Sequence, residues 1–327
     1  MKKKVFSGVQ PSGNLHIGNY LGAIRNWVEV QGQYENVFCV VNAHAITVPQ
    51  EPAVLHAKTR EVAAIYMACG IDPEESVVFV QSHVPAHFEL TWMLNGITPM
   101  GWLNRMTQFK EKAGEERESV STGLFDYPVL MASDILLYDA DLVPVGSDQT
   151  QHIELTRDIA QRFNYLFGDT FKLPQALVRE TGARIMALDE PTKKMSKSSE
   201  SPMGAVDLLD TPDAIKRKIM RAVTDPLRGI AFDPERHGLF NLLTIYQLLS
   251  GSSRDQIESH FEGKGYAELK RELVDLVVES LRPIQERYAQ IMAEPQYLED
   301  VLARGAERAS VISEAKLRQA KEHMGLL

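Results

Sequence analysis

The chain has 327 residues, of which 44% are hydrophobic and 24% charged, and its net charge is −9. Its length suggests about two domains, and its composition is that of a globular protein with a buried core. It contains no apolar run of about 18 residues, which argues against a membrane span, and its basic start lacks the apolar stretch of a signal peptide. The acidic balance argues against a general nucleic-acid coat but leaves room for a local basic patch.

Strand-like and helix-like segments alternate in the first 200 residues. Short apolar runs rich in β-branched residues predict strands at 4–8, 36–45, 76–82, 142–146 and 183–188. Periodic apolar residues predict helices between them, at 18–30, 53–70, 127–140 and 147–164. This alternation predicts an α/β fold with a doubly wound parallel sheet. We therefore expect a Rossmann-like catalytic domain over residues 1–200.

Strand signals stop after about residue 200, and the remaining apolar residues have helical spacing. The predicted helices lie at 211–224, 239–249, 254–261, 269–291 and 310–324. Pro283 predicts a kink in the fourth of them. We therefore expect a C-terminal all-α domain over residues 201–327, whose last helix could pack back on the first domain.

A loop rich in glycine, serine and proline joins the first predicted strand to the first helix, in the sequence GVQPSGNLHIGNYLG. Open α/β sheets bind nucleotides at such turns, and the amides at a helix start favour a phosphate. His16 places a hydrogen-bond donor just ahead of the helix. The spacing matches neither the dinucleotide fingerprint nor a P-loop. By itself, the segment could equally be a glycine-rich loop with a capping histidine.

A second polar loop follows the last predicted strand, in the sequence PTKKMSKSSESPMG. It combines Lys193, Lys194 and Lys197 with several serines. Flexible ammonium groups suit the phosphates of a nucleotide, in particular a departing pyrophosphate. By itself, this segment could equally be a solvated basic linker between domains.

Together the two loops resemble the paired signatures of class I aminoacyl-tRNA synthetases. HIGN at 16–19 is similar to the HIGH motif with Asn in its last position, and KMSKS at 194–198 matches the second motif letter for letter. Further stretches, such as MTQFKEK, DYPVLMASDILLY and VPVGSDQTQHIELTRDIAQRFN, resemble the bacterial tryptophanyl-tRNA synthetases. The resemblance implies activation of L-tryptophan with Mg-ATP to tryptophanyl-adenylate and pyrophosphate. Transfer of tryptophan to the 2′-hydroxyl of the terminal adenosine of tRNA(Trp) would follow.

The resemblance also implies which residues hold ATP, a substrate that brings its own Mg²⁺. Phosphoryl chemistry of this kind depends on positioning and charge stabilisation. Asp148 would accept ribose hydroxyls, and the backbone of Ile185 would contact adenine. The implied catalytic residues are His16, Asn19, Lys112, Lys194 and Lys197. The implied ATP contacts are Gln10, Pro11, Ser12, Gly18, Asn19, Gly146, Ser147, Asp148, Ile185, Lys194, Met195, Ser196, Lys197 and Ser198.

One part of this assignment stays open on the sequence. Lys112 lies in a highly charged loop and could be a solvated charge. The resemblance implies no metal ligand among the protein side chains.

Selection of tryptophan needs more than an apolar pocket, because such pockets discriminate weakly between similar ligands. A buried acceptor for the indole N–H discriminates better, since a ligand that lacks this donor leaves the acceptor unpaired. Asp134 lies on an otherwise apolar predicted helix, which is costly without a partner. The resemblance implies that Asp134 is this acceptor. The other implied pocket residues are Phe6, His44, Met131 and Gln149.

On the residues alone, Asp134 could be a salt-bridged core acid and His44 a satisfied core histidine. Phe6 and Met131 would then be plain core residues. Some positions also depart from the commoner family pattern, which leaves pocket tuning and loop kinetics open; they are Asn42, Ala43, Trp102, Ser147 and Ser199.

The resemblance implies a homodimer that binds tRNA through its helical domain, in the cytoplasm, with no membrane or DNA partner. The low cysteine content, Cys39 and Cys69 only, fits core thiols of a cytoplasmic protein. One predicted helix carries a basic cluster, for which phosphate contact and a solvated face are both open; it comprises Lys216, Arg217, Lys218 and Arg221.

Three alternatives remain. A tyrosyl-tRNA synthetase shares the fold and both signatures, and activation of tyrosine would identify it. A small-molecule adenylyltransferase would lack the helical domain. A non-catalytic paralogue that binds nucleotide or RNA should have lost His16 or the signature lysines, which this chain retains.

Overall fold

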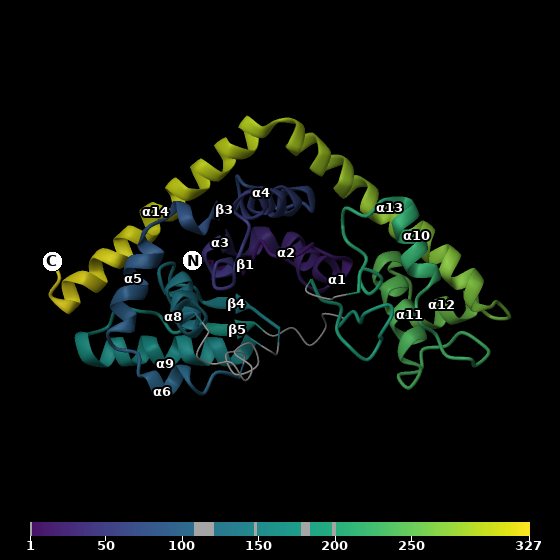
Figure 1. The fold of residues 1–327 in the computed structure, drawn as a ribbon, viewed down its shortest axis with the longest axis horizontal. Coiled ribbons are helices and arrows are strands. Elements are labelled where there is room, and N and C mark those ends of the chain that lie inside the picture. The colour runs from purple at the N-terminus through teal and green to yellow at the C-terminus, as the bar shows by residue number, and fades with distance from the viewer. Residues whose placement is uncertain (1, 108–120, 147–148, 178–183, 198–200) are drawn as a thin grey trace.

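The structure is a computed structural model of the chain, and it describes residues 2–107, 121–146, 149–177, 184–197 and 201–327. Within these residues a parallel sheet of five strands lies at the centre (Figure 1). The strands are β1 (Lys4–Val9), β2 (Glu35–Val40), β3 (Val77–Val80), β4 (Leu142–Pro144) and β5 (Gln175–Leu177). Their order is β3-β2-β1-β4-β5, so the direction of winding reverses between β1 and β4. This order confirms the predicted doubly wound parallel sheet.

Helices connect the strands and cover both faces of the sheet. The first is α1 (Ile17–Asn19), which continues through a π-helical turn (Tyr20–Ile24) into α2 (Arg25–Val30). The others in this part of the chain are α3 (Asn42–Ala45), α4 (Pro52–Ala68), α5 (Ala86–Asn95), α6 (Met100–Leu103), α8 (Thr122–Leu136) and α9 (Thr150–Phe167). No helix in the described ranges is both long enough and apolar enough to cross a membrane.

Strand β2 shows why the helices lie on both faces. Phe38 and Val40 belong to one core cluster, which also contains residues of α4. Val37 and Cys39 belong to a second cluster, with residues of α8 and α9. Successive side chains of a strand point to opposite faces, so both faces of the sheet are buried under helices, as is usual for parallel sheets.

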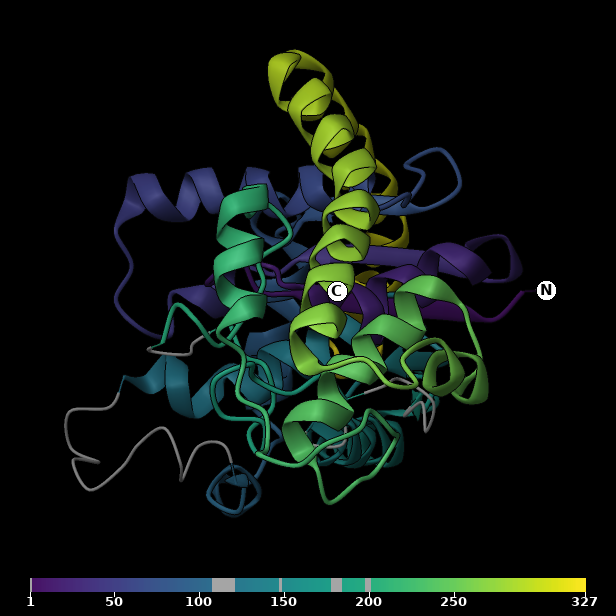
Figure 2. The same cartoon turned by 90° about the vertical axis from the view of Figure 1, so that its right-hand side faces the viewer.

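The chain after residue 200 is helical wherever it forms regular structure in the described residues. Its helices are α10 (Pro212–Met220), α11 (His237–Ser250), α12 (Arg254–His260), α13 (Tyr266–Ala293) and α14 (Pro295–Met324). In Figure 1, α10, α11 and α12 lie at one end of the molecule, and α13 and α14 form the two sloping sides of a roof over the sheet. The view in Figure 2 shows α13 rising past α10.

The last helix returns to the sheet. A Cβ atom on Gly305 of α14 would lie 1.8 Å from the carbonyl oxygen of Val78 in β3, so only glycine permits this contact. Arg308 donates hydrogen bonds to the carbonyl oxygens of Pro73 (2.8 Å) and Ser76 (3.1 Å). The helical region also shares a core with the sheet, because Leu243 and Leu273 belong to the cluster that contains Phe38.

Three predicted elements differ from the structure. The strand predicted at 36–45 is too long, because β2 ends at Val40 and Asn42–Ala45 form α3. The strand predicted at 183–188 is wrong, because the fifth strand is Gln175–Leu177. This strand is short, sits at the sheet edge and lacks a fully buried apolar run, whereas Ile185 and Leu188 are buried in a loop that forms a bridge between Met186 and Lys194.

The last helix also begins earlier than predicted. It starts at Pro295 rather than Ser310, because its first half packs through small residues such as Gly305 and Ala306 that give a weak apolar signal. Helix α13 continues through Pro283 without a break.

Candidate active site

A cavity of about 620 Å³ opens between the carboxyl ends of β1 and β4. Within the described residues, β1 pairs with β2 from Lys4 to Val9 but with β4 only at Val5 and Leu142, so β1 and β4 diverge beyond that point. Residues 6–10 form one wall of the cavity and residues 143–146 another. Open α/β sheets bind their ligands at this type of position, where the strand order reverses.

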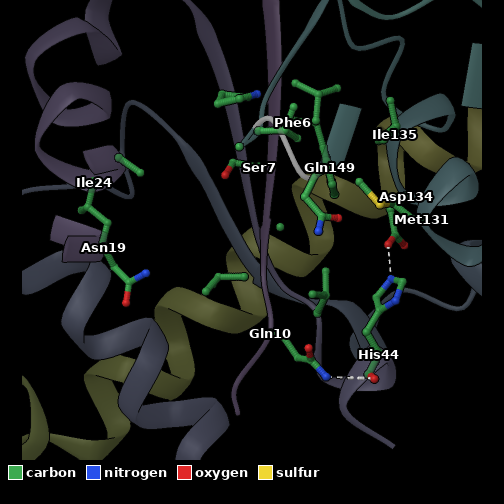
Figure 3. A pocket seen from close by; sticks show the side chains of 18 of the residues that line it. Phe6, Ser7, Gln10, Asn19, Ile24, His44, Met131, Asp134, Ile135 and Gln149 are labelled. Atoms are coloured by element: carbon green, nitrogen blue, oxygen red, sulfur yellow. Dashed lines mark hydrogen bonds and ion pairs between the residues drawn. The ribbon is translucent and has the colours of Figure 1, made fainter. Parts of the chain in front are cut away.

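The cavity brings together residues from distant parts of the sequence (Figure 3). Every side chain predicted for the tryptophan site lines it, namely Phe6, His44, Met131, Asp134 and Gln149. Part of the predicted ATP site lines the same cavity, namely Gln10, Asn19, Gly146 and Lys197. The predicted tryptophan site and part of the predicted ATP site therefore border the same cavity.

Asp134 is the central polar group of this cavity, and it is only 1% exposed. Its Oδ2 accepts a hydrogen bond from His44 Nε2 at 2.7 Å, as Figure 3 shows. Its Oδ1 accepts from Gln81 Nε2 at 2.7 Å and is 2.6 Å from His87 Nδ1. Burial alone would raise the pKa of the Asp134 carboxyl, but the hydrogen bonds from the two histidines lower it to about 2. The carboxylate is thus ionised and acceptor-only.

His44 is held in turn by the loop that follows β1. Gln10 Nε2 donates to the carbonyl oxygen of His44 at 3.0 Å, which Figure 3 also shows. Tyr127 lies edge-on to the His44 ring, with the ring centroids 6.3 Å apart. His44 and Asp134 therefore interact directly, and both also border the cavity, while their role toward a substrate stays a prediction.

The start of the first helix lies beside the cavity. His16 is 3% exposed and does not line the cavity directly. Burial lowers the pKa of His16 to about 4, and the positive charges of Lys197 and Lys194 act in the same direction. The imidazole is therefore neutral at pH 7, and its Nδ1 has no hydrogen-bond partner among the described residues.

Two loops meet at the helix start. A Cβ atom on Gly18 would lie 2.9 Å from His16 Nδ1 and 3.4 Å from the Cβ of Ile185, so glycine is needed for this close packing. The backbone N–H of Met195 donates to the carbonyl oxygen of Ile185 at 3.0 Å. The segments that carry the two predicted motifs are thus in contact in the fold.

Lys197 reaches the cavity from the second motif. Its Nζ lies 3.4 Å from the carbonyl oxygen of Gln10, and burial lowers its pKa to about 8. The turn at Gly13 has φ +65°, and a Cβ there would lie 2.6 Å from the Lys197 carbonyl oxygen. Lys194 is exposed and does not line the cavity.

The remaining predicted site residues fall into two groups. Three lie outside the cavity lining: Pro11, which is buried; Ser12, which is half-buried; and Ser196, which is exposed. Lys112, Ser147, Asp148 and Ser198 lie outside the described residues, as does Ser199.

Known proteins of similar sequence and structure come from one family. Residues 1–282 match the family described as tRNA synthetases class I (W and Y). The tryptophan–tRNA ligase of Wolinella succinogenes is 53% identical over 327 residues, which is the whole of both chains. The chain belongs to the tryptophan–tRNA ligase family of class I tRNA synthetases.

Solved structures from the tryptophan–tRNA ligase family have the same fold as this chain. The tryptophanyl-tRNA synthetase of Mycoplasma pneumoniae has a TM-score of 0.90 at 36% identity, over 99% of this chain and 98% of that one. The tryptophanyl-tRNA synthetase of Campylobacter jejuni, complexed with ADP and tryptophan, has a TM-score of 0.86 at 37% identity, over 98% and 99%.

Two further side chains bond to Asp134 without having been predicted from the sequence, namely Gln81 and His87. Gln81 directly follows β3, so the rule that ligand sites lie at carboxyl ends of strands could have marked it. His87 has no such signal. The departures Asn42 and Ala43 contact the same segment, because Asn42 Nδ2 donates to Ser82 Oγ (2.8 Å) and the Ala43 N–H to Gln81 Oε1 (3.1 Å).

The basic cluster on α10 is smaller than the sequence suggests. Lys218 is 7% exposed and pairs with Asp210 at 2.6 Å, so it cannot serve as a free phosphate contact. Lys216, Arg217 and Arg221 are exposed.

Proposed function

We propose that this chain activates L-tryptophan with Mg-ATP and then transfers tryptophan to the 2′-hydroxyl of the terminal adenosine of tRNA(Trp). The observation that carries the proposal is the cavity at the β1–β4 divergence. It has a buried, ionised acceptor, Asp134, and a motif lysine, Lys197, in its lining. The family membership of the chain supports the same reaction.

Activation needs no protein nucleophile, because the carboxylate of tryptophan attacks the α-phosphate itself. The P–O bond to the leaving group then breaks, and pyrophosphate departs. The work of the protein is to position the two substrates and to stabilise charge on the phosphates. Lys197 and Lys194 would hold the pyrophosphate. His16, neutral in the free protein, would offer one ring N–H to a phosphate oxygen.

The ATP site is proposed along the contact between the two motif segments. Asn19 and Gln10 border the cavity, and Gly146 ends its opposite wall. Ile185 and Met195 are buried next to the helix start, where their backbone could meet adenine. The rest of the proposed site is the predicted set, including Pro11, Ser12, Gly18 and Ser196 and the residues outside the described ranges: Lys112, Ser147, Asp148 and Ser198.

The proposed tryptophan site places the indole N–H at Asp134. Phe6, Met131 and Gln149 line the same cavity, and His44 is bonded to the acceptor. An apolar wall with one buried acceptor suits an indole ring, because the ring buries a large apolar area and carries one N–H donor.

We propose that residues 1–200 are the catalytic domain and residues 201–327 the tRNA anticodon-binding domain, in a cytoplasmic enzyme with no membrane or DNA partner. The exposed Lys216, Arg217 and Arg221 support phosphate contact by α10. We also propose a homodimer. Phe88 and Trp92, four residues apart on α5, are 40% and 80% exposed, and Met100 of α6 is 65% exposed. Exposed apolar side chains such as these suit a protein interface.

The test is ATP–pyrophosphate exchange with Mg²⁺ and each of the twenty amino acids in turn. Exchange with tryptophan alone is the expected result, followed by charging of tRNA(Trp). Exchange with tyrosine instead would refute the pocket assignment within a correct fold. No exchange with any amino acid would refute the enzymatic proposal and favour a non-catalytic paralogue.

A further inference from the structure

The two oxygens of Asp134 have different numbers of partners. Each carboxylate oxygen has two acceptor sites. Both sites of Oδ1 are used, by Gln81 Nε2 at 2.7 Å and His87 Nδ1 at 2.6 Å. Among the residues that the structure describes, Oδ2 accepts one bond, from His44 Nε2 at 2.7 Å. One acceptor site on Oδ2 therefore remains for a ligand. Oδ2 is also the oxygen bonded to His44, which lines the cavity, whereas Gln81 and His87 do not.

His87 is locked from both sides of its ring. The ionised carboxylate can only accept, so His87 Nδ1–H must donate to it. His87 Nε2 lies 2.8 Å from the Tyr138 hydroxyl, which can donate in return. Burial raises the pKa of Tyr138, which keeps this proton in place.

Gln81 is held in the same way. Its Oε1 accepts from the backbone N–H of Ala43 at 3.1 Å, which leaves Nε2 facing Asp134. Gln81, His87 and Asp134 are each at most 1% exposed. Water therefore has little access to Oδ1, and the two donors to it are fixed by the Ala43 backbone and the Tyr138 hydroxyl.

We propose that His87 is a positioning residue that, together with Gln81, saturates Oδ1 of Asp134 and so presents one acceptor site on Oδ2 to the indole N–H of tryptophan. This inference rests on the proposed function. It assigns a specificity role to a side chain that does not touch the substrate. The competing interpretation is that His87 only fills the core, where its ring lies 5.8 Å from Phe79 and 5.6 Å from Tyr138.

The two interpretations differ in how the enzyme should treat a ligand that lacks the N–H. We would compare kcat/KM in ATP–pyrophosphate exchange for tryptophan and for its benzothiophene analogue, in which sulfur replaces the indole N–H. The variants are His87→Leu, which removes the donor, and His87→Asn, whose amide can replace Nδ1–H. Phe163→Leu controls for loss of packing, because Phe163 lies in the same core cluster as Phe79 and Tyr138 but makes none of these hydrogen bonds.

In the native protein tryptophan should be strongly preferred to the analogue. His87→Leu should lower that preference by about tenfold, because the acceptor is no longer held in one orientation. His87→Asn should retain most of the preference, and Phe163→Leu should leave it unchanged. Tyr138→Phe removes the hydrogen bond to His87 Nε2 and should lower the preference by a few-fold. This variant replaces His87→Leu in the test if the leucine variant does not fold.

An unchanged preference in His87→Leu, or in Tyr138→Phe where the leucine variant does not fold, would overturn the positioning role. The proposed function would stand in that case, because the native chain would still exchange with tryptophan. Failure of the native chain to exchange with tryptophan is a separate result, and it would overturn both.

Discussion

Replacing Asp134 by asparagine keeps the side-chain volume but removes the charge. The amide oxygen can still accept from Gln81 and His87, which places the NH₂ group toward His44 and the cavity. His44 can adapt by changing tautomer, whereas the indole N–H cannot, because it only donates. A lost hydrogen bond to a charged group costs about 1.5–3 kcal/mol. The KM for tryptophan should therefore rise roughly 10- to 150-fold.

The assay is ATP–pyrophosphate exchange at varied tryptophan and at varied ATP. The KM for ATP should stay within about twofold of the native value, because Asp134 would touch only the amino acid. Asp126→Asn is the matched control, since Asp126 lies on the same helix, bonds to Asn95 and does not line the cavity. An unchanged KM for tryptophan in Asp134→Asn would refute the role of this carboxylate.

Three further predictions concern other parts of the molecule. Because burial lowers the pKa of Lys197 to about 8, kcat/KM for ATP should fall about tenfold per pH unit above that value. Lys197→Arg stays charged and should flatten the pH profile; an unaltered profile would contradict this. Gly305→Ala should lower the free energy of unfolding in urea by at least about 1–3 kcal/mol, whereas Gly101→Ala, with open space around it, should not. Trp92→Glu should yield monomers in light scattering, and a retained dimer would exclude this surface as the interface.

The sequence predicted secondary structure best where a local residue pattern alone determines the local structure. The segment from Gly8 to Gly22 runs from the end of β1 through a loop into the first helix as predicted, because glycine and proline interrupt both periodicities there. The fifth strand could not be predicted in the same way. Gln175–Leu177 is a short edge strand, while the more apolar 185–188 segment is buried through tertiary contacts in a loop.

Site residues could be predicted only where a single residue is chemically unusual for its place in the sequence. An acid on an apolar helix demands partners, so Asp134 could be singled out. Two of its partners were not singled out, because Gln81 and His87 lie 53 and 47 positions earlier in the chain. His87 meets Asp134 through packing of α5 on α8, and Gln81 meets it from the end of β3. Lys218 shows the opposite case. It was grouped with its charged neighbours, but its position on α10 turns it inward to Asp210.

The sparse pairing of β1 with β4 has a consequence for the mechanics of the sheet. Within the described residues, Val5 and Leu142 are the recorded register pair at this seam, whereas β1 and β2 pair along the full length of β1. A ligand that fills the cavity would contact both of its walls, residues 6–10 and residues 143–146, and connect β1 to β4 where the backbone does not. A ligand at 100 times its Kd adds about 2.7 kcal/mol to folding stability. A bound ligand would therefore help to hold β1 and β4 together at the centre of the sheet.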